Sequence, residues 1–237
     1  MPRFVKRNLT FLFFLFLPLL LSAQGKHLFI LSGQSNMQAL NPKTFTETVA
    51  SVFGDEKVIV VKDAKGGKPI RCWFDDWELK AFENPKRNLP NLYTPLISKT
   101  KKAIGNNQIA TITFVWMQGE RDARESLSGA YAENLMRVYK QLVRDLNYKN
   151  INMVIGRLSD FDMTNSVAPH WTKMRDVQVA LANSSPRFGW INTDDLNEGL
   201  NFKGKEIKND LHMSVEGYKK MGVRFAKKSI ALIQDNM

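Results

Sequence analysis

The fold is decided by the stretch HLFILSGQSNM, which occupies residues 27–37. Residues 27–31 form an apolar run typical of a strand that is buried on both faces, and Gly33 then predicts a sharp turn. A serine at such a turn exposes its hydroxyl at the start of the next helix, where backbone N–H groups and the helix dipole favour an anion. Ser35 is therefore a candidate nucleophile, with an ordinary Gly-Ser turn as the alternative.

The first 23 residues have the layout of a secretory signal peptide. Arg3, Lys6 and Arg7 precede an apolar run at residues 9–21, and Ala23 offers a small residue for cleavage. The run is short for a membrane span, although an uncleaved anchor is the alternative. We expect a signal peptide at residues 1–23 and a single domain at 24–237. The mature protein would then be secreted or periplasmic, without stable membrane insertion.

The charge of the chain is basic, with 34 Lys and Arg residues against 23 Asp and Glu residues. Three basic residues lie in the predicted signal peptide, so the remaining residues have a net charge of 31 minus 23, or +8. The basic residues are scattered, with neither an aromatic-interleaved stripe nor zinc-ligand spacing, so no nucleic-acid partner is predicted. A solvated basic surface would instead favour acidic polymers or envelopes without specificity. Cys72 is the only cysteine, which excludes an internal disulfide and favours a packed small residue.

Short β-type runs alternate with longer amphipathic segments along the chain. The predicted strands are His27–Leu31, Val58–Lys62, Ile109–Trp116, Met153–Arg157 and Gly189–Asn192. The predicted helices lie around Leu92–Ile104, Ser128–Leu146, Ala168–Ala182 and Ser214–Ile233. This alternation predicts an α/β fold in which helices cover both faces of a parallel sheet. Between the second strand and the first of these helices, residues 65–91 form a long loop region of the kind that is often functional.

Polar residues follow three of the predicted strands, at the sheet edge where α/β proteins bind ligands. Ser35 follows the first strand, Gly66 and Gly67 follow the second, and Gln118 follows the third. A glycine lets a backbone N–H approach a substrate oxygen, and an amide side chain can donate a second hydrogen bond. With the Ser35 N–H, these groups could form an oxyanion hole.

Among the three histidines, His212 is the best candidate for a general base. It lies on a predicted loop before the last helix, with Asp210 two residues earlier. An imidazole held by a carboxylate is what a serine nucleophile needs. His27 and His170 are interpreted as structural, because one lies in a strand and the other begins a helical segment.

Four blocks appear in order: GQSNM at 33–37, Gly66-Gly67, WMQGERDA at 116–123 and DLH at 210–212. Together they resemble the SGNH-type hydrolases. More narrowly, they are similar to the sialate O-acetylesterase-like group that includes the acetylxylan esterases of carbohydrate esterase family six. The resemblance spans about residues 27–225. It implies a three-layer α/β/α sandwich with a five-stranded parallel flavodoxin-like sheet, no metal or cofactor, and hydrolysis of acetyl esters on sugar hydroxyls.

The resemblance also implies roles for single residues. Ser35 would be the nucleophile and His212 the general base and acid, with Gly67 and Gln118 completing the oxyanion hole. Asn36 and Arg121 match positions that shape the substrate pocket. Related enzymes place Asp three residues before the histidine, but Asn209 stands there in this chain. Either Glu120 or Asp210 could therefore orient His212, and both could contribute.

The expected function is removal of acetyl groups from the sugar hydroxyls of an acetylated carbohydrate, of the acetylxylan or sialic acid type, through a Ser-His-acid acetyl-enzyme mechanism. A short-chain esterase or thioesterase of other specificity is one alternative, and a non-catalytic glycan-binding relative is another. Trp73 and Trp77 lie in the long loop region and are candidates for stacking on sugar rings, with core packing as the alternative.

Overall fold

The computed structural model describes residues 25–75 and 89–236. Its centre is a sheet of five parallel strands in the order β2-β1-β3-β4-β5. The strands are β1 (Lys26–Gly33), β2 (Val58–Ala64), β3 (Ile109–Met117), β4 (Asn152–Gly156) and β5 (Phe188–Ile191). The predicted signal peptide at 1–23 lies outside the described residues, so the predicted domain boundary stays a prediction.

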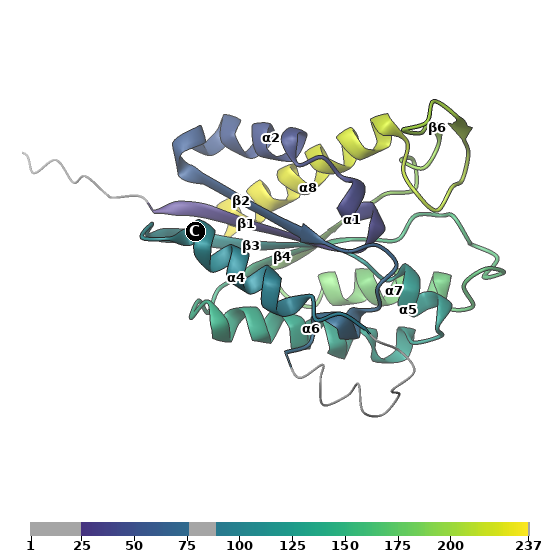
Figure 1. The fold of residues 1–237 in the computed structure, drawn as a ribbon, viewed down its shortest axis with the longest axis horizontal. Coiled ribbons are helices and arrows are strands. Elements are labelled where there is room, and N and C mark those ends of the chain that lie inside the picture. Colours follow the sequence, from purple (N-terminus) through teal and green to yellow (C-terminus); the bar gives the residue numbers. More distant parts are fainter. Residues whose placement is uncertain (1–24, 76–88, 237) are drawn as a thin grey trace, which may run out of the picture.

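Helices cover both faces of the sheet and make three layers (Figure 1). One face carries α1 (Ser35–Ala39), α2 (Lys43–Phe53) and α8 (Val215–Asp235). The other face carries α4 (Tyr93–Ile104), α6 (Ser128–Asp145) and α7 (Trp171–Ala182). Short elements complete the chain: the 3₁₀ turns η1 (Asp55–Lys57) and η2 (Ile70–Trp73), helix α5 (Glu120–Arg124), and the hairpin strands β6 (Gly199–Leu200) and β7 (Glu206–Ile207). The predicted α/β sandwich and five-stranded parallel sheet are confirmed.

Strand β1 shows why the apolar run of the sequence determines this architecture. Successive side chains of a strand point to opposite faces, so Leu28 and Ile30 enter the core beneath α4, α6 and α7. Phe29 and Leu31 enter the core beneath α2 and α8. All four side chains are fully buried. A strand with helices on both faces therefore needs the continuous apolar run, not an alternating one.

The order of the strands also places the site. The chain passes from β1 to β2 on one side, then crosses to β3 on the other side of β1. Such a reversal opens a crevice at the carboxyl ends of the two strands, here β1 and β3. Ser35 follows β1 and Glu120 follows β3, so both residues lie at this crevice.

The predicted strands agree with the structure to within two residues at each end, and α7 begins at Trp171, three residues later than expected. Helix α2 was not predicted. Its Phe45, Val49 and Phe53 recur every four residues and pack in the core, but threonines and valines give the segment a weak helical propensity. The hairpin β6–β7 was also missed, because strands of two residues leave no periodic pattern.

None of the helices within the described residues is both long and apolar enough to cross a lipid bilayer.

Candidate active site

Ser35 is the first residue of α1, directly after the end of β1. The turn is tight at Gly33, whose φ is 142° and whose hypothetical Cβ would lie 1.9 Å from the carbonyl oxygen of Met117. Only glycine fits there, and the next amide, that of Gln34, donates a 2.9 Å hydrogen bond to the same Met117 oxygen. The turn therefore joins β1 closely to β3. The Ser35 N–H, in the first turn of its helix, has no intrahelical acceptor.

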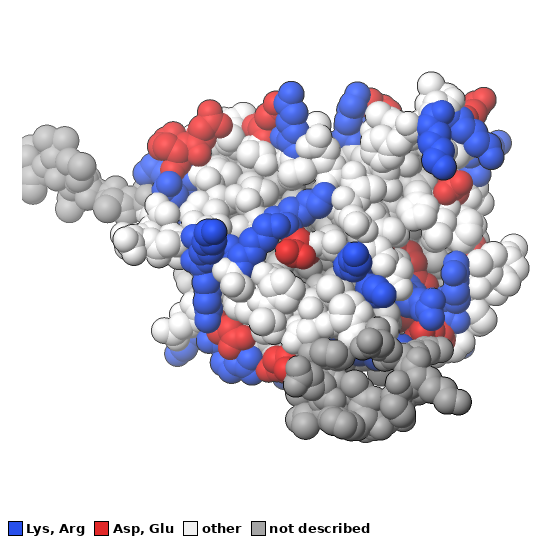
Figure 2. Space-filling view, viewed as in Figure 1, with Lys and Arg blue, Asp and Glu red and all other residues white. Residues whose placement is uncertain are grey.

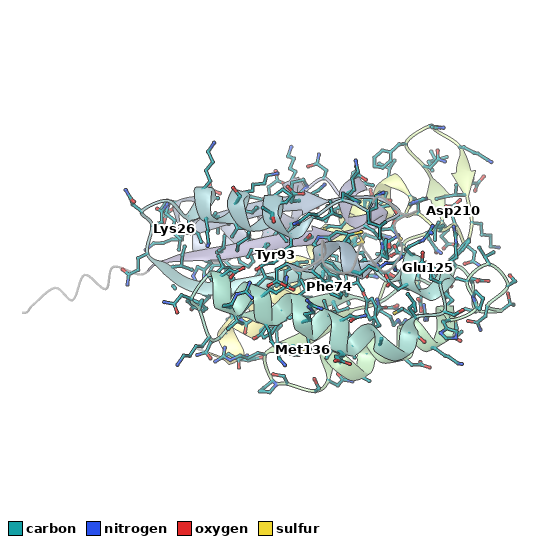
Figure 3. The ribbon with its side chains drawn as sticks, turned by 60° about the horizontal axis from the view of Figure 1, so that its bottom comes forward. Lys26, Phe74, Tyr93, Glu125, Met136 and Asp210 are labelled. Atoms are coloured by element: carbon teal, nitrogen blue, oxygen red, sulfur yellow. The ribbon has the colours of Figure 1, made fainter. Side chains whose placement is uncertain are left out.

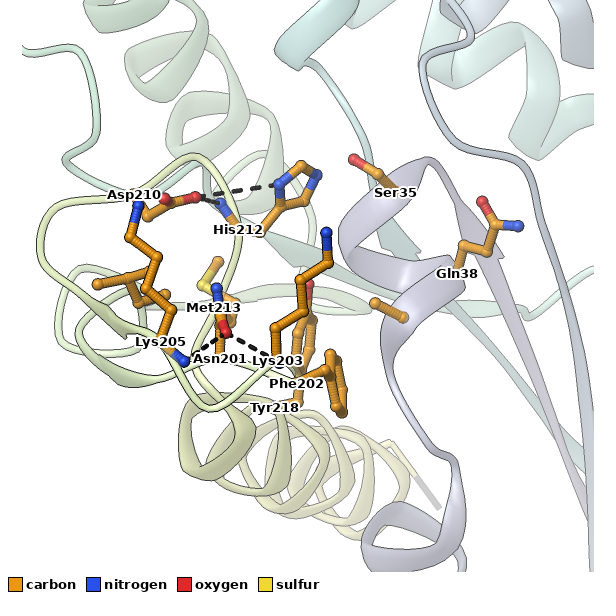
Figure 4. Close-up of a pocket in the computed structure, with 12 residues that line it drawn as sticks. Ser35, Gln38, Asn201, Phe202, Lys203, Lys205, Asp210, His212, Met213 and Tyr218 are labelled. Atoms are coloured by element: carbon orange, nitrogen blue, oxygen red, sulfur yellow. Dashed lines mark hydrogen bonds and ion pairs between the residues drawn. The ribbon is translucent and has the colours of Figure 1, made fainter.

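His212 lies on the loop that precedes α8, where Ser214 caps the helix by accepting a 3.0 Å hydrogen bond from the Gly217 N–H. Figure 4 shows the imidazole of His212 facing the hydroxyl of Ser35. Residues from opposite ends of the chain are thus brought together, and their roles as nucleophile and base stay predictions.

Asp210 is the carboxylate next to His212. Its Oδ1 accepts a 2.9 Å hydrogen bond from the His212 backbone N–H and lies 4.0 Å from His212 Nδ1. A separation of 4.0 Å is too long for a hydrogen bond, but both side chains are nearly half exposed (43% and 47%) and can turn toward each other. In Figure 3, Asp210 lies at the end of the molecule opposite Lys26, the first residue of β1.

Two pockets meet at Ser35 and His212. The larger has a volume of about 690 Å³ and is bordered by α1 and by the hairpin segment with Phe202, Lys203 and Lys205. The smaller has a volume of about 250 Å³ and is bordered by Gly66, Gly67, Glu120, Arg121 and Arg124. Ser35 and His212 therefore lie between a wide pocket and a narrow one, an arrangement that fits an ester with one large and one small substituent.

Gly67 lies beside Ser35 in the smaller pocket, with a left-handed φ of 68° and open space where a Cβ would be. The neighbouring Gly66 N–H donates a 2.8 Å hydrogen bond to Gln38 Oε1. Among the described residues, no group accepts a hydrogen bond from the Gly67 N–H. The N–H groups of Ser35 and Gly67 are therefore available to a substrate oxygen.

Gln118 does not join them, and its predicted place in the oxyanion hole is wrong. Its side chain is fully buried. Its Nε2 donates a 2.5 Å hydrogen bond to Asp122 Oδ2 and makes longer contacts of 3.3 Å with Gln34 Oε1 and the Lys68 carbonyl. Because its N–H groups are committed inside the protein, Gln118 braces the loops around Ser35 and does not contact substrate.

Asn36 is also a correction, because it does not line the substrate pocket. It is buried, and its Nδ2 donates to Glu120 Oε1 at 3.0 Å and to the Leu211 carbonyl at 3.2 Å. Its Oδ1 accepts a 3.0 Å hydrogen bond from the hydroxyl of Tyr218. Asn36 therefore joins α1, α5, α8 and the loop of His212 from behind the site.

Glu120 is held by Asn36 and has no hydrogen bond to His212. Burial raises the pKa of Glu120 to about 7, against the lowering effect of the hydrogen bonds that it accepts. Its Oε2 has no partner among the described residues. Burial likewise raises the pKa of the nearby Asp122 to about 6. Of the two acids considered for orienting His212, only Asp210 approaches the imidazole, whereas Glu120 borders the smaller pocket.

Arg121 borders the smaller pocket, as expected of a residue near substrate, and its Nε donates a 2.7 Å hydrogen bond to Glu125 Oε1. Its predicted contact with substrate stays a prediction.

Trp73 is a third correction, because it is almost fully buried. Its Nε1 donates to Ser32 Oγ at 3.1 Å and its ring packs edge-on against Trp116. Trp73 cannot stack on a sugar, and Trp77 lies outside the described residues.

The remaining reactive side chains have structural roles. Cys72 is buried, and desolvation raises the pKa of its thiol to about 11, which keeps the thiol protonated. His27 packs against Phe53 and contacts Thr111 at 2.8 Å. His170 contacts Ser128 at 2.9 Å. Cys72 and both histidines therefore match their predicted roles.

The hairpin around β6 and β7, which forms one wall of the larger pocket, is not predicted from the sequence. Its Lys203 and Lys205 are among the scattered basic residues, and Phe202 belongs to no motif. The signal that could have located them is their position close before the DLH block, which places them on the approach to His212.

A family model for carbohydrate esterases, described as sialic acid-specific acetylesterase, matches residues 40–231. The chain belongs to this family. It is therefore a carboxylic ester hydrolase of the carbohydrate acetylesterase class. The matched range begins just after Ser35, so the assignment of the nucleophile rests on the geometry of the site.

Solved structures share the fold of this acetylesterase family member. A protein from Arabidopsis thaliana superposes with a TM-score of 0.64 at 18% identity, over 87% of this chain and 98% of that chain. NanS gives a TM-score of 0.59 at 14% identity, over 81% and 71% of the two chains. A carbohydrate acetylesterase from Xanthomonas citri gives 0.56 at 19% identity, over 78% of this chain and only 39% of that longer protein. Among curated protein sequences, none matches this esterase.

Proposed function

We propose that the protein removes O-acetyl groups from carbohydrates through an acetyl-enzyme formed on Ser35. The observation that carries this proposal is the meeting of Ser35 and His212 at the border of two pockets of unequal size. The smaller pocket, with the free N–H groups, would take the acetyl group. The larger pocket would take the sugar.

In the first step, His212 accepts the Ser35 proton while Ser35 Oγ attacks the acetyl carbonyl carbon. The carbonyl oxygen becomes an oxyanion, which the N–H groups of Ser35 and Gly67 stabilise. As the tetrahedral intermediate collapses, the bond from carbon to the sugar oxygen breaks, and His212 returns the proton to that oxygen. The products of this step are the acetyl-enzyme and the free sugar hydroxyl.

In the second step, water attacks the acetyl-enzyme while His212 accepts its proton, and acetate leaves as Ser35 recovers its hydrogen. Asp210 supports both steps from the side of Nδ1, where a carboxylate favours the imidazolium that forms after proton transfer. The 4.0 Å separation in the free protein would shorten when substrate narrows the site.

We further propose that the enzyme acts outside the cytoplasm after loss of residues 1–23. This rests on the signal-like pattern of the N-terminus, in which basic residues precede an apolar run that ends at a small residue.

Acetate release by the purified protein tests the proposed activity. The substrates are p-nitrophenyl acetate, acetylated xylan and O-acetyl sialic acid, and Ser35→Ala is the matched variant because it removes only one oxygen atom. We expect release by the wild type and a loss of at least a thousandfold in Ser35→Ala. Equal rates in both proteins would contradict the mechanism. Faster hydrolysis of long acyl esters would indicate a different esterase, and a folded protein without any activity would indicate a glycan-binding relative.

A further inference from the structure

Three pockets around the site adjoin one another, and we call them together the groove. A third pocket of about 280 Å³, lined by Lys68, Pro69 and Arg71, shares Gly67 and Arg121 with the smaller site pocket. The smaller pocket in turn shares Ser35 and His212 with the larger one. Pockets that share lining residues adjoin each other, so the groove extends from Lys68 past the nucleophile to the hairpin.

One end of the groove carries the two lysines of the hairpin. Lys203 and Lys205 both line the larger pocket, and in Figure 4 the ammonium group of Lys203 reaches toward the space between Ser35 and His212. Neither lysine forms an ion pair with a carboxylate of the described residues. Their charges are therefore available to a ligand.

The other end of the groove carries a second group of cations on the far side of Ser35. Lys68 and Arg124 line it without an ion pair among the described residues. Arg71 and Arg121 share a single carboxylate, that of Glu125, at 2.7 Å each. Figure 2 shows basic side chains both over the hairpin end of the molecule and below it, on the side of α5.

Within the described part of the chain, the groove has fewer acidic than basic residues. The acidic residues are Asp210, which we assign to His212, the shared Glu125, and Glu120, which is buried against Asn36. Among the described residues, six basic side chains and three carboxyl groups therefore line the groove, and the surplus positive charge lies on both sides of Ser35. A neutral ligand would desolvate these cations without pairing with them, which costs free energy.

The larger pocket also offers a flat apolar surface. Phe202 is 66% exposed and lies parallel to the ring of Tyr218, with 5.4 Å between the ring centroids. An exposed aromatic face beside cationic groups suits a sugar ring that carries an acidic substituent.

We propose that this groove binds an extended acidic polysaccharide, with carboxylates on sugars to either side of the acetylated one. The proposal rests on the acetylesterase function proposed above and adds the class of polymer. A single sugar acid has one carboxylate and can pair with only one of the two cationic groups, whereas a chain of uronic acids reaches both. The hairpin lysines and the cations near α5 then select the polymer from opposite sides of Ser35.

Binding to the Ser35→Ala protein tests the groove without turnover. The ligands are de-esterified oligogalacturonates of one, three and six residues, with xylohexaose as the neutral ligand of equal length. We expect affinity for the acidic ligands to rise more than tenfold from one residue to six and to fall with added salt, because exposed charges are screened. Equal affinity for xylohexaose, no gain with length, or tighter binding of a single-stranded DNA of equal charge would overturn the proposal.

Matched charge variants locate the binding surface. The double variant Lys203→Gln, Lys205→Gln removes two charges from the groove, and Lys101→Gln, Lys102→Gln removes two from the exposed end of α4. We expect the first to weaken binding of the hexamer about tenfold, consistent with two exposed ion pairs, and the second to leave it unchanged. Equal losses in both variants would contradict a specific site.

Rates of acetate release distinguish a failure of the acidic groove from a failure of the proposed esterase function. Relative to the wild type, the hairpin double variant should show an about tenfold lower ratio of kcat/KM for acetylated oligogalacturonate to kcat/KM for p-nitrophenyl acetate. If Ser35-dependent release occurs without any preference for acidic oligomers, the esterase stands and the acidic groove is refuted. If acidic oligomers bind as expected but no substrate loses acetate, the groove stands and the esterase is refuted.

Discussion

The carboxamide of Asn36 donates a 3.0 Å hydrogen bond to the buried carboxyl group of Glu120, and the same nitrogen donates to the carbonyl oxygen of Leu211. Asn36 follows Ser35 in the chain, and Leu211 precedes His212. One buried amide therefore links the backbone segments that carry Ser35 and His212. We interpret Asn36 as a positioning residue, because it acts on Ser35 and His212 through the backbone.

Replacement of Asn36 by alanine tests this role. In Asn36→Ala, the Glu120 carboxyl group and the Tyr218 hydroxyl lose their buried partners, which should lower the free energy of unfolding by about 2–4 kcal/mol. It should also lower kcat more than it raises KM, since the His212 loop loses its anchor. Urea unfolding and acetate release at several substrate concentrations measure both effects. Tyr218→Phe is the control: it keeps the link to Leu211 and should lose less stability, and an equal fall of kcat there would contradict the interpretation.

The raised pKa of Glu120 gives a prediction for stability against pH. Burial moves this pKa from 4.5 to about 7, so the native state holds a proton that the unfolded state releases between those values. The free energy of unfolding should therefore fall as pH rises from about 4.5 to 7, by roughly 3 kcal/mol for a shift of this size. In Glu120→Gln, the side-chain amide does not titrate in this pH range, so this contribution to the pH dependence is absent. The urea midpoints of this variant between pH 4 and 8 should show a weaker fall, and parallel curves for the two proteins would refute the shift.

Asp210→Asn distinguishes the two acids proposed for His212. The substitution keeps an oxygen that can accept from the His212 N–H, so the loop should stay in place. It removes the negative charge that favours the imidazolium, which should lower kcat by roughly ten- to a hundredfold. The loss should be smaller than for a fully buried acid, since solvent reaches Asp210. Unchanged kcat in Asp210→Asn, with a large loss in Glu120→Gln, would transfer the role to Glu120.

The sequence was sufficient to predict the sheet, because strand patterns and turn residues are local signals. The run at residues 27–31 predicted a strand buried on both faces, and Gly33 predicted the turn that presents Ser35. The ends of parallel strands converge on one edge of a sheet, so the meeting of Ser35 and Gly67 also followed from the order of the elements, whereas Gln118, predicted to join them, turns into the protein. His212 could be placed with them because it was the best histidine left for the role.

The direction of a side chain could not be predicted in the same way. Gln118, Asn36 and Trp73 lie next to the site in sequence, but all three point into the protein and bond to other buried groups. Their partners come from segments far away in the chain, and no local pattern encodes such contacts. The hairpin with Phe202 was missed for a similar reason, since its place beside Ser35 depends on how the loop folds back over α8.

Two aromatic substitutions, one buried and one exposed, test which residues contact the carbohydrate. Trp73→Phe should cost about 1–3 kcal/mol in the free energy of unfolding, because it leaves a small cavity and removes the hydrogen bond to Ser32. Its KM for a polymeric substrate should not change, since Trp73 is out of reach of solvent.

Phe202→Ala should show the opposite pattern: stability within about 0.5 kcal/mol of the wild type, but a higher KM for the polymer. Urea unfolding and acetate release from one acetylated polymer give both quantities for each variant. A raised KM in Trp73→Phe would restore the loop tryptophan as a sugar platform, and an unchanged KM in Phe202→Ala would remove the hairpin from the binding surface.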